Sequence, residues 1–209
     1  MKNMDLKMIA KVILIAGIIL CGIAQILPWG EFSLGNLMTV SFFHWGGLMV
    51  TSPLTPSPET YFTPTDFSGI PSSPVIYGFA FGTLFLYFIL PLCLISLIAG
   101  IVAYRKIGRK RSKNSLHAGV SGLMAMFSFI IYIQLSYLSN IEEYIKEFEQ
   151  TEGISLSSSY YWSPGFYLMI ISTILFFISY AAIRRIYKEG KNEQMPKKGE
   201  TEDKLKKKV

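Results

Sequence analysis

Four long stretches of this sequence combine a continuous apolar body with the absence of Asp, Glu, Lys and Arg, and this combination constrains the fold more than any other feature. The stretches are residues 12–30, 68–104, 114–141 and 153–183. Each holds about 20 mostly apolar residues, the length that an α-helix needs to cross roughly 30 Å of hydrocarbon. Only 16% of the 209 residues are charged, whereas soluble domains have about 25%. The sequence therefore predicts an all-α integral membrane protein with a bundle of four transmembrane helices.

The four stretches divide the chain into membrane spans and connecting segments. We place the spans at residues 12–28, 76–104, 115–138 and 165–187. The segments before, between and after them are residues 1–11, 29–75, 105–114, 139–164 and 188–209. No small-x-small cleavage motif follows the first apolar run, so we expect a retained span there rather than a cleaved signal peptide. The last segment, 188–209, is of mixed charge without periodicity, and we expect a disordered tail.

The positive charges predict the orientation of the spans. Four crossings put both termini on one side, and residues 1–11, 105–113 and 184–209 on that side hold 19 of the 20 Lys and Arg. Lys146 is the exception. An excess of Lys and Arg in short segments marks the cytoplasmic face. We therefore expect a protein of the plasma membrane with both termini in the cytoplasm. Segments 29–75 and 139–164 then lie outside.

The first outer segment, 29–75, is too long for a simple connection. Its first half contains LMTVSFFHW, rich in β-branched and aromatic residues, between the turn signals Gly35-Asn36 and Gly46-Gly47. We expect two or three strands in 29–51, and one short edge strand near 60–63 in the proline-rich second half. The sheet has one apolar face that can pack on the outer ends of the helices.

The second outer segment, 139–164, extends this picture. Its apolar residues Ile141, Tyr144, Ile145 and Phe148 recur at helical spacing, so we expect the third helix to continue to about residue 150. The run ISLSSSYYW that follows Gly153 reads as a strand that joins the sheet of the first segment.

Aromatic and glycine residues in both outer segments carry a resemblance to a known family. Trp29 follows the first span, Trp45-Gly46-Gly47-Leu48 comes some eighteen residues later, and Trp162 begins the run WSPGFYL at the fourth span. In these motif residues and in its arrangement of spans and loops, the chain resembles the claudin-like superfamily of four-span proteins. That superfamily includes claudins, peripheral myelin protein, γ-type calcium-channel subunits and fungal eisosome proteins. The chain departs from that pattern at Met49, where the family has Trp, and it lacks the two loop cysteines.

The resemblance implies a small extracellular β-sheet formed mainly by the first outer loop. It also implies a function through contacts, since members of the family seal paracellular spaces or modulate partner channels. Our first hypothesis is a non-enzymatic tetraspan protein that binds other membrane proteins, or copies of itself, laterally or outside the cell. The alternative is an accessory subunit of a larger membrane transporter or enzyme complex.

Little in the sequence points to chemistry. Inside the predicted hydrocarbon region there is no Asp, Glu or Arg of the kind that marks ion pathways, and His44 and His117 are the only histidines. No nucleophile motif or phosphate-binding glycine loop occurs. We therefore expect no catalytic residue, metal site, cofactor, nucleic-acid partner or small-molecule substrate. Cys21 and Cys93 lie in predicted spans, and we expect them to be buried without a disulfide.

Small residues four apart within the spans can bring helices close together. Gly78 and Gly82 form such a pair, as do Ser96 with Gly100 and Ala118 with Gly122. These positions serve either the packing of the four helices on each other, which we favour, or an interface with a partner in the membrane.

Overall fold

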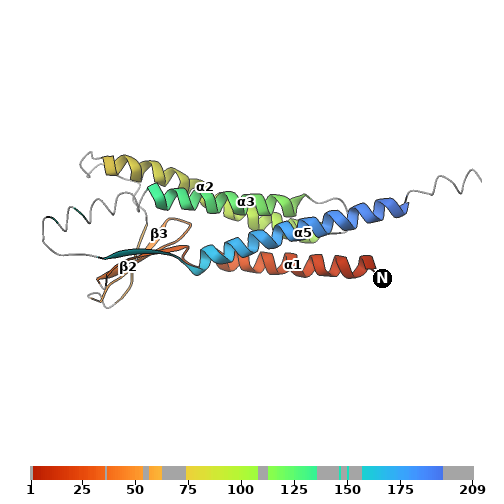
Figure 1. Ribbon diagram of the computed structural model, residues 1–209, viewed down its shortest axis with the longest axis horizontal. Coiled ribbons are helices and arrows are strands. Elements are labelled where there is room, and N and C mark those ends of the chain that lie inside the picture. Colours follow the sequence, from red (N-terminus) through yellow and green to blue (C-terminus); the bar gives the residue numbers. More distant parts are fainter. Residues whose placement is uncertain are drawn as a thin grey trace, which may run out of the picture.

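Four long helices dominate the computed structural model, which describes residues 2–35, 37–53, 57–62, 74–107, 113–135 and 157–194 together with Lys146 and Gln150. The helices are α1 (Lys2–Ala24), α2 (Pro74–Lys106), α3 (Asn114–Ile133) and α5 (Pro164–Gln194). They form an elongated bundle, and a small sheet lies at one end of it (Figure 1). All four include a segment long and apolar enough to cross a membrane: Leu6–Ala24, Tyr87–Lys106, Asn114–Ile133 and Pro164–Lys188. The prediction of a four-helix bundle is confirmed.

Side-chain hydroxyl groups connect the helices inside the bundle. The most extensive helix contacts join α2 to α3 and α1 to α5. Hydroxyl groups at these interfaces donate hydrogen bonds to main-chain carbonyl groups of a neighbouring helix. These bonds satisfy polar groups that would otherwise cost free energy in an apolar surrounding. These bonds run from Ser96 Oγ to Ala118 O (2.7 Å), from Ser115 Oγ to Phe176 O (2.7 Å) and from Ser172 Oγ to Gly17 O (2.9 Å).

Two of the predicted packing glycines lie between the helices of the bundle itself. A Cβ atom at Gly100 would lie 2.9 Å from Phe176 Cε1 and 3.2 Å from Ile18 Cγ1. At Gly122 it would lie 2.6 Å from Thr173 Oγ1. Both positions therefore serve packing within the bundle. Gly78 and Gly82 belong to α2, but their surroundings lie outside the side-chain environments that the structure describes.

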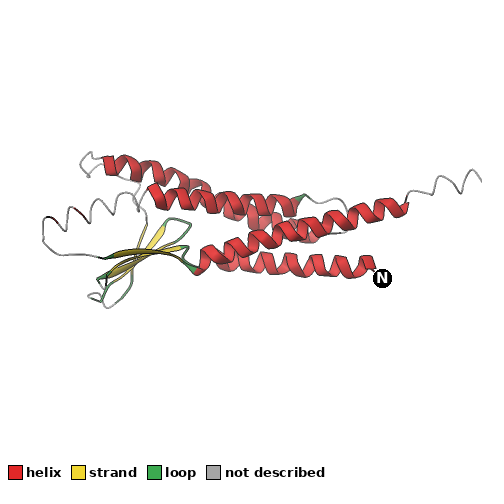
Figure 2. Ribbon diagram, in the orientation of Figure 1, coloured by secondary structure: helices red, strands yellow, loops and turns green. Residues whose placement is uncertain are grey.

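The sheet has five antiparallel strands (Figure 2). They are β1 (Gly30–Leu34), β2 (Met38–Phe42), β3 (Gly47–Thr51), β4 (Glu59–Phe62) and β5 (Ser158–Trp162). Their order is β4-β3-β2-β1-β5, so the first long connection supplies four strands and the segment before α5 supplies the fifth. The predicted strands in 29–51, the edge strand near 60–63 and the joining strand before the fourth span are confirmed.

The pairing register divides the sheet into an apolar and a polar face. Phe32 is the Cα partner of both Val40 and Tyr160, and the neighbouring row pairs Phe42 with Leu48. Because side chains alternate between faces along a strand, Phe32, Val40, Phe42 and Tyr160 share one face. Ser33, Thr39 and Thr51 share the opposite face, since Thr39 pairs with both of the others. The apolar face is buried at Phe32 and Phe42.

Two helices extend well beyond the predicted spans. Helix α1 begins at Lys2, within the segment expected to precede the span. Helix α5 continues to Gln194, so residues 188–194, which were assigned to a disordered tail, are helical. Helical hydrogen bonds are local, and Lys, Glu and Gln in this segment favour a helix even without apolar periodicity. Residues 195–209 lie outside the described part of the chain, as does most of 136–156, where the third helix was expected to continue.

Candidate functional site

Trp29 joins the end of α1 to the start of the sheet. It lies between Ala24, the last residue of α1, and Gly30, the first of β1, and its side chain is fully buried. Its indole Nε1 donates a hydrogen bond to the Ala24 carbonyl (2.8 Å), one of the last carbonyls of a helix that lack a partner within it. Its main-chain N–H donates to the Phe42 carbonyl at 2.7 Å. One residue thus completes the helix end and fixes the direction in which the sheet leaves it.

The ring of Trp29 also contacts side chains from three other parts of the fold. Phe129 of α3 and Phe166 of α5 meet it edge-on, with centroid distances of 5.2 and 6.0 Å. His44, in the turn between β2 and β3, lies 5.2 Å away at an interplanar angle of 31°. Aromatic pairs contribute about 0.5–1.5 kcal/mol each beyond their buried area. These contacts hold the sheet against two helices.

Strand β5 approaches the same place from the far end of the sequence. Trp162 stacks on Phe166 with centroids 4.4 Å apart, and Tyr160 meets Trp162 edge-on at 5.1 Å. We call Trp29 and these surrounding aromatic residues the junction cluster. Its members are Trp29, Phe42, His44, Phe129, Tyr160, Trp162 and Phe166.

Main-chain contacts connect the two segments that carry the junction cluster. Ser163 N donates to Trp29 O (3.1 Å) and Gly165 N donates to Pro28 O (3.0 Å). A Cβ atom at Gly165 would lie 2.6 Å from the Pro28 carbonyl oxygen and 2.7 Å from Trp29 Cδ1, closer than side chains tolerate. Glycine at this position therefore lets the start of α5 lie directly against the end of the first connection.

Buried polar atoms in the junction cluster remain uncharged at neutral pH. Among the residues that the structure describes, His44 Nδ1, Tyr160 Oη and Ser163 Oγ are buried without a hydrogen-bond partner. Burial lowers the pKa of His44 to about 4. Burial also raises the pKa of Tyr160, and the nearby Tyr132 raises it further. The cluster is therefore a neutral aromatic contact, and its stability depends on His44 staying unprotonated.

The predicted motif residues divide into two groups in the structure. Trp29 and Trp162 both enter the junction cluster, through their shared contacts with Phe129 and Phe166. Trp45 instead stacks on Phe43 at 5.1 Å. It also lies over Gly47, where a Cβ atom would overlap its ring.

The other motif positions lie in the same turn. Gly46 has a φ of 90°, which L side chains rarely adopt. Gly47 and Leu48 begin β3, and the side chain of Leu48 is outside the described part. Sequence reasoning did not single out His44, Phe129 or Phe166. The position of His44 within an aromatic run was a signal that it could be buried among aromatic rings. Nothing in the sequence distinguishes Phe129 and Phe166 from the many other apolar residues of their helices.

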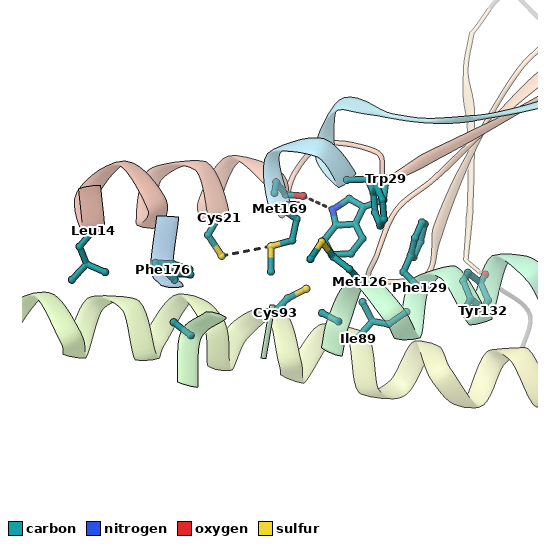
Figure 3. Close-up of a cluster of buried hydrophobic side chains, with 14 of the residues drawn as sticks. Leu14, Cys21, Trp29, Ile89, Cys93, Met126, Phe129, Tyr132, Met169 and Phe176 are labelled. Carbon is teal, nitrogen blue, oxygen red and sulfur yellow. Dashed lines mark hydrogen bonds between the residues drawn. The ribbon is translucent and has the colours of Figure 1, made fainter. Parts of the chain in front are cut away.

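A second cluster lies inside the bundle and contains both cysteines (Figure 3). Cys21 and Cys93 are free and fully buried, as predicted. Cys21 Sγ donates a long hydrogen bond to Met169 Sδ at 4.0 Å. Gln25 Nε2 donates to the Cys21 carbonyl (3.1 Å) and approaches Cys21 Sγ at 3.8 Å. These four residues form the sulfur cluster.

The arrangement defines a class of protein and not an individual one. It has four helices that are long and apolar enough to cross a membrane, and a small antiparallel sheet is held on one end of this bundle. In the described part of the chain, no three His, Cys, Asp or Glu side chains come together as a metal site would require. Comparisons with protein-family models and with curated proteins found no match.

Proposed function

We propose that this chain is a non-enzymatic, claudin-like plasma-membrane protein that binds other membrane proteins, or copies of itself, through its sheet and helices. The observation that carries the proposal is the junction cluster. Trp29 contacts the end of α1 and side chains of α3 and α5, so the sheet has a fixed position on the bundle. A surface held in place before it binds loses little conformational entropy on binding.

The exposed part of the sheet provides surface for such contacts. Tyr161, on edge strand β5, is 61% exposed, and Leu37, in the turn between β1 and β2, is 51% exposed. Tyrosine is among the residues enriched at protein interfaces. Strands β4 and β5 form the two edges of the sheet.

The strand arrangement supports the claudin-like part of the proposal. Four of the five strands come from the first long connection, and the resemblance implies a small sheet formed mainly by that connection. Trp29 and Gly47-Leu48 occupy the matching places, but this chain has Met49 and no cysteine in either connection. The junction cluster supplies apolar contacts that order the sheet without a disulfide.

The distribution of Lys and Arg supports the proposed orientation. Of the 20 Lys and Arg, 19 belong to segments 1–11, 105–113 and 184–209, and among the described residues Arg105, Lys106, Arg184 and Arg185 lie toward the helix ends remote from the sheet. By the positive-inside rule, this distribution supports cytoplasmic termini and a sheet outside the cell.

Co-purification tests the proposal. The full chain is extracted in mild detergent, and the proteins that accompany it are identified by mass spectrometry. We expect membrane proteins or further copies of the chain with the wild type, and their loss with Trp29→Ala, which releases the sheet. Gly22→Ala is the matched control, because a Cβ atom there meets nothing within 4 Å.

The outcomes separate the two hypotheses. Partners that are retained by Trp29→Ala, or the absence of any partner, would contradict contacts through the sheet. Stable recovery of the catalytic or transporting subunits of one complex would instead favour the accessory-subunit alternative.

A further inference from the structure

The sulfur cluster brings together residues that are far apart in the sequence. Cys21 belongs to α1, Cys93 to α2 and Met169 to α5, and all three side chains are fully buried. Figure 3 shows the three sulfur atoms directed toward the same interior space. In the same view Cys93 extends from α2 toward Cys21 and Met169. The only two cysteines of the chain thus lie beside a thioether.

The spacing of the sulfur atoms suits a shared ion. Cys21 Sγ and Met169 Sδ are 4.0 Å apart. Metal–sulfur bonds are about 2.3 Å long, so two sulfur ligands of one trigonal or tetrahedral ion lie roughly 3.8–4.0 Å apart. An ion between these two atoms would require little movement of the helices.

Gln25 is a polar residue at the edge of this cluster that packing alone does not explain. Its Nε2 faces Cys21 Sγ at 3.8 Å. Its Oε1 is buried and has no hydrogen-bond partner in the described residues, which costs free energy in an apolar surrounding. An amide N–H beside the Cys21 sulfur can stabilise the negative charge that a thiolate acquires when it binds a metal.

We propose that Cys21, Cys93 and Met169 form a binding site for Cu(I), with Gln25 as a positioning residue. Soft thiolate and thioether ligands favour Cu(I), Zn²⁺ and iron–sulfur clusters, and a set of two thiolates and one thioether fits Cu(I), the softest of these ions. On binding, each cysteine thiol loses one proton and forms one sulfur–copper bond, and the Met169 thioether supplies the third. Two protons leave and one monovalent cation enters, so the site carries one negative charge, which the Gln25 N–H faces. No electron is transferred.

The same geometry disfavours Zn²⁺. Structural zinc sites use four tetrahedral ligands drawn from Cys, His, Asp and Glu. The described residues bring no third side chain of these types to Cys21 and Cys93. The proposal is independent of the contact function proposed above.

Metal titration of the full chain tests this site. The protein is purified in detergent under anaerobic, reducing conditions and titrated with Cu(I) against a chromophoric Cu(I) chelator. We expect one ion per chain, with sulfur as the only ligand type in X-ray absorption, and no comparable retention of Zn²⁺. Because binding displaces protons, the affinity for Cu(I) should rise by about tenfold per pH unit for each proton lost.

Variants distinguish this site from adventitious binding. Cys21→Ala and Cys93→Ala should each weaken Cu(I) binding by more than ~100-fold, and Gln25→Leu by about 10–100-fold, the range seen when residues behind metal ligands are changed. Met169→Leu keeps the volume of the side chain but removes the thioether, and should reduce the number of sulfur ligands by one. Met124→Leu is the matched control, since Met124 is 53% exposed, and should bind as the wild type does.

The measurement on the wild-type protein is sufficient to contradict the proposal, even if a variant fails to fold. No retained Cu(I) in the folded wild type would contradict the site. Equal retention by the wild type and by folded Cys21→Ala and Cys93→Ala variants would also contradict it, because the copper would then be bound elsewhere.

Discussion

At the scale of single residues, one tryptophan does most to connect the two parts of the fold. Trp29 completes the end of α1 through its indole N–H and contacts aromatic rings from α3 and α5. An aromatic residue after the first span could have been a lipid-interface anchor alone. The structure buries it instead, because the sheet and the start of α5 cover it.

Trp29→Ala should therefore release the sheet from the bundle. Loss of a buried Trp side chain typically costs about 3–5 kcal/mol, and the Ala24 carbonyl also loses its partner. We expect residues 30–62 to become sensitive to protease while the helices stay inserted. Tyr161→Ala, at an exposed aromatic position, should change the free energy of unfolding by no more than ~0.5 kcal/mol. Equal protease resistance of the Trp29 variant and the wild type would contradict the anchoring role.

His44 should make the attachment of the sheet sensitive to acid. Burial lowers its pKa from 6.5 to about 4, so between these values the unfolded sheet binds a proton that the folded sheet does not. Stability is therefore complete above about pH 6.5 and falls as the pH decreases toward 4, by a total of about 3 kcal/mol. Denaturation midpoints of the sheet at several pH values measure this slope. His44→Phe, which keeps an aromatic ring beside Trp29, should abolish it, and an unchanged slope would exclude His44 as the cause.

At the scale of elements, the helices approach closely where their residues are small. Gly100 and Gly122 leave space for Phe176 and Thr173 of α5, and serine hydroxyls bond to carbonyls of adjacent helices. The strands follow a different rule, since alternation of side chains gives the sheet its apolar face. Each element thus carries in its own sequence the face that it buries.

Adding one methyl group should have opposite effects at two helical glycines. Gly100→Ala would force a Cβ atom to within 2.9 Å of the buried Phe176 ring, and overpacking of this kind costs about 1–3 kcal/mol. Gly22→Ala meets nothing within 4 Å and should stabilise α1 by roughly 0.4–1 kcal/mol, because alanine restricts the unfolded chain. Thermal unfolding of the two variants in detergent measures the difference. Equal melting temperatures would mean that the helices are less closely packed than described.

At the scale of the whole molecule, the sheet and the positive charges lie at opposite ends. The sheet is at the end of the bundle where α1 finishes and α5 starts, and the N-terminus lies at the other end (Figure 1). Helices α2 and α5 carry Arg105, Lys106, Arg184 and Arg185 toward their ends remote from the sheet. This polarity suits a protein inserted in one orientation.

The proposed orientation predicts which positions are reached from outside the cell. Single cysteines introduced at Ser57 and Ser157 should react with a membrane-impermeant thiol reagent in intact cells, whereas a cysteine at Ser112 should react only after permeabilisation. The native cysteines are buried and contribute little background. Labelling at Ser112 alone in intact cells would reverse the assigned topology.

Much of the architecture could be predicted from local sequence patterns. Charge-free apolar runs mark α1, α2, α3 and α5 because the length and polarity of each segment are properties of that segment alone. The turn residues and β-branched runs mark the strands for the same reason. The end of α5 at Gln194 was missed because a polar helix end has no apolar periodicity to reveal it.

The candidate sites depend on residues that no local pattern relates to each other. Phe129 and Phe166 resemble any other apolar residue of a span, yet they complete the junction cluster. No sequence pattern relates Gln25 to a binding site, and the position of its amide beside the Cys21 sulfur could not be predicted.

The sequence by itself determined the number of helices, the strands of the first connection and the asymmetry of charge, because each depends on residues that are neighbours in the chain. Only the tertiary structure decided that β5 pairs with β1, that His44 is buried against Trp29, and that Cys21 and Cys93 lie beside Met169. Those contacts join segments more than a dozen residues apart, and many pairings of apolar faces are compatible with the same local patterns. Close packing of all the elements at once selects one of them.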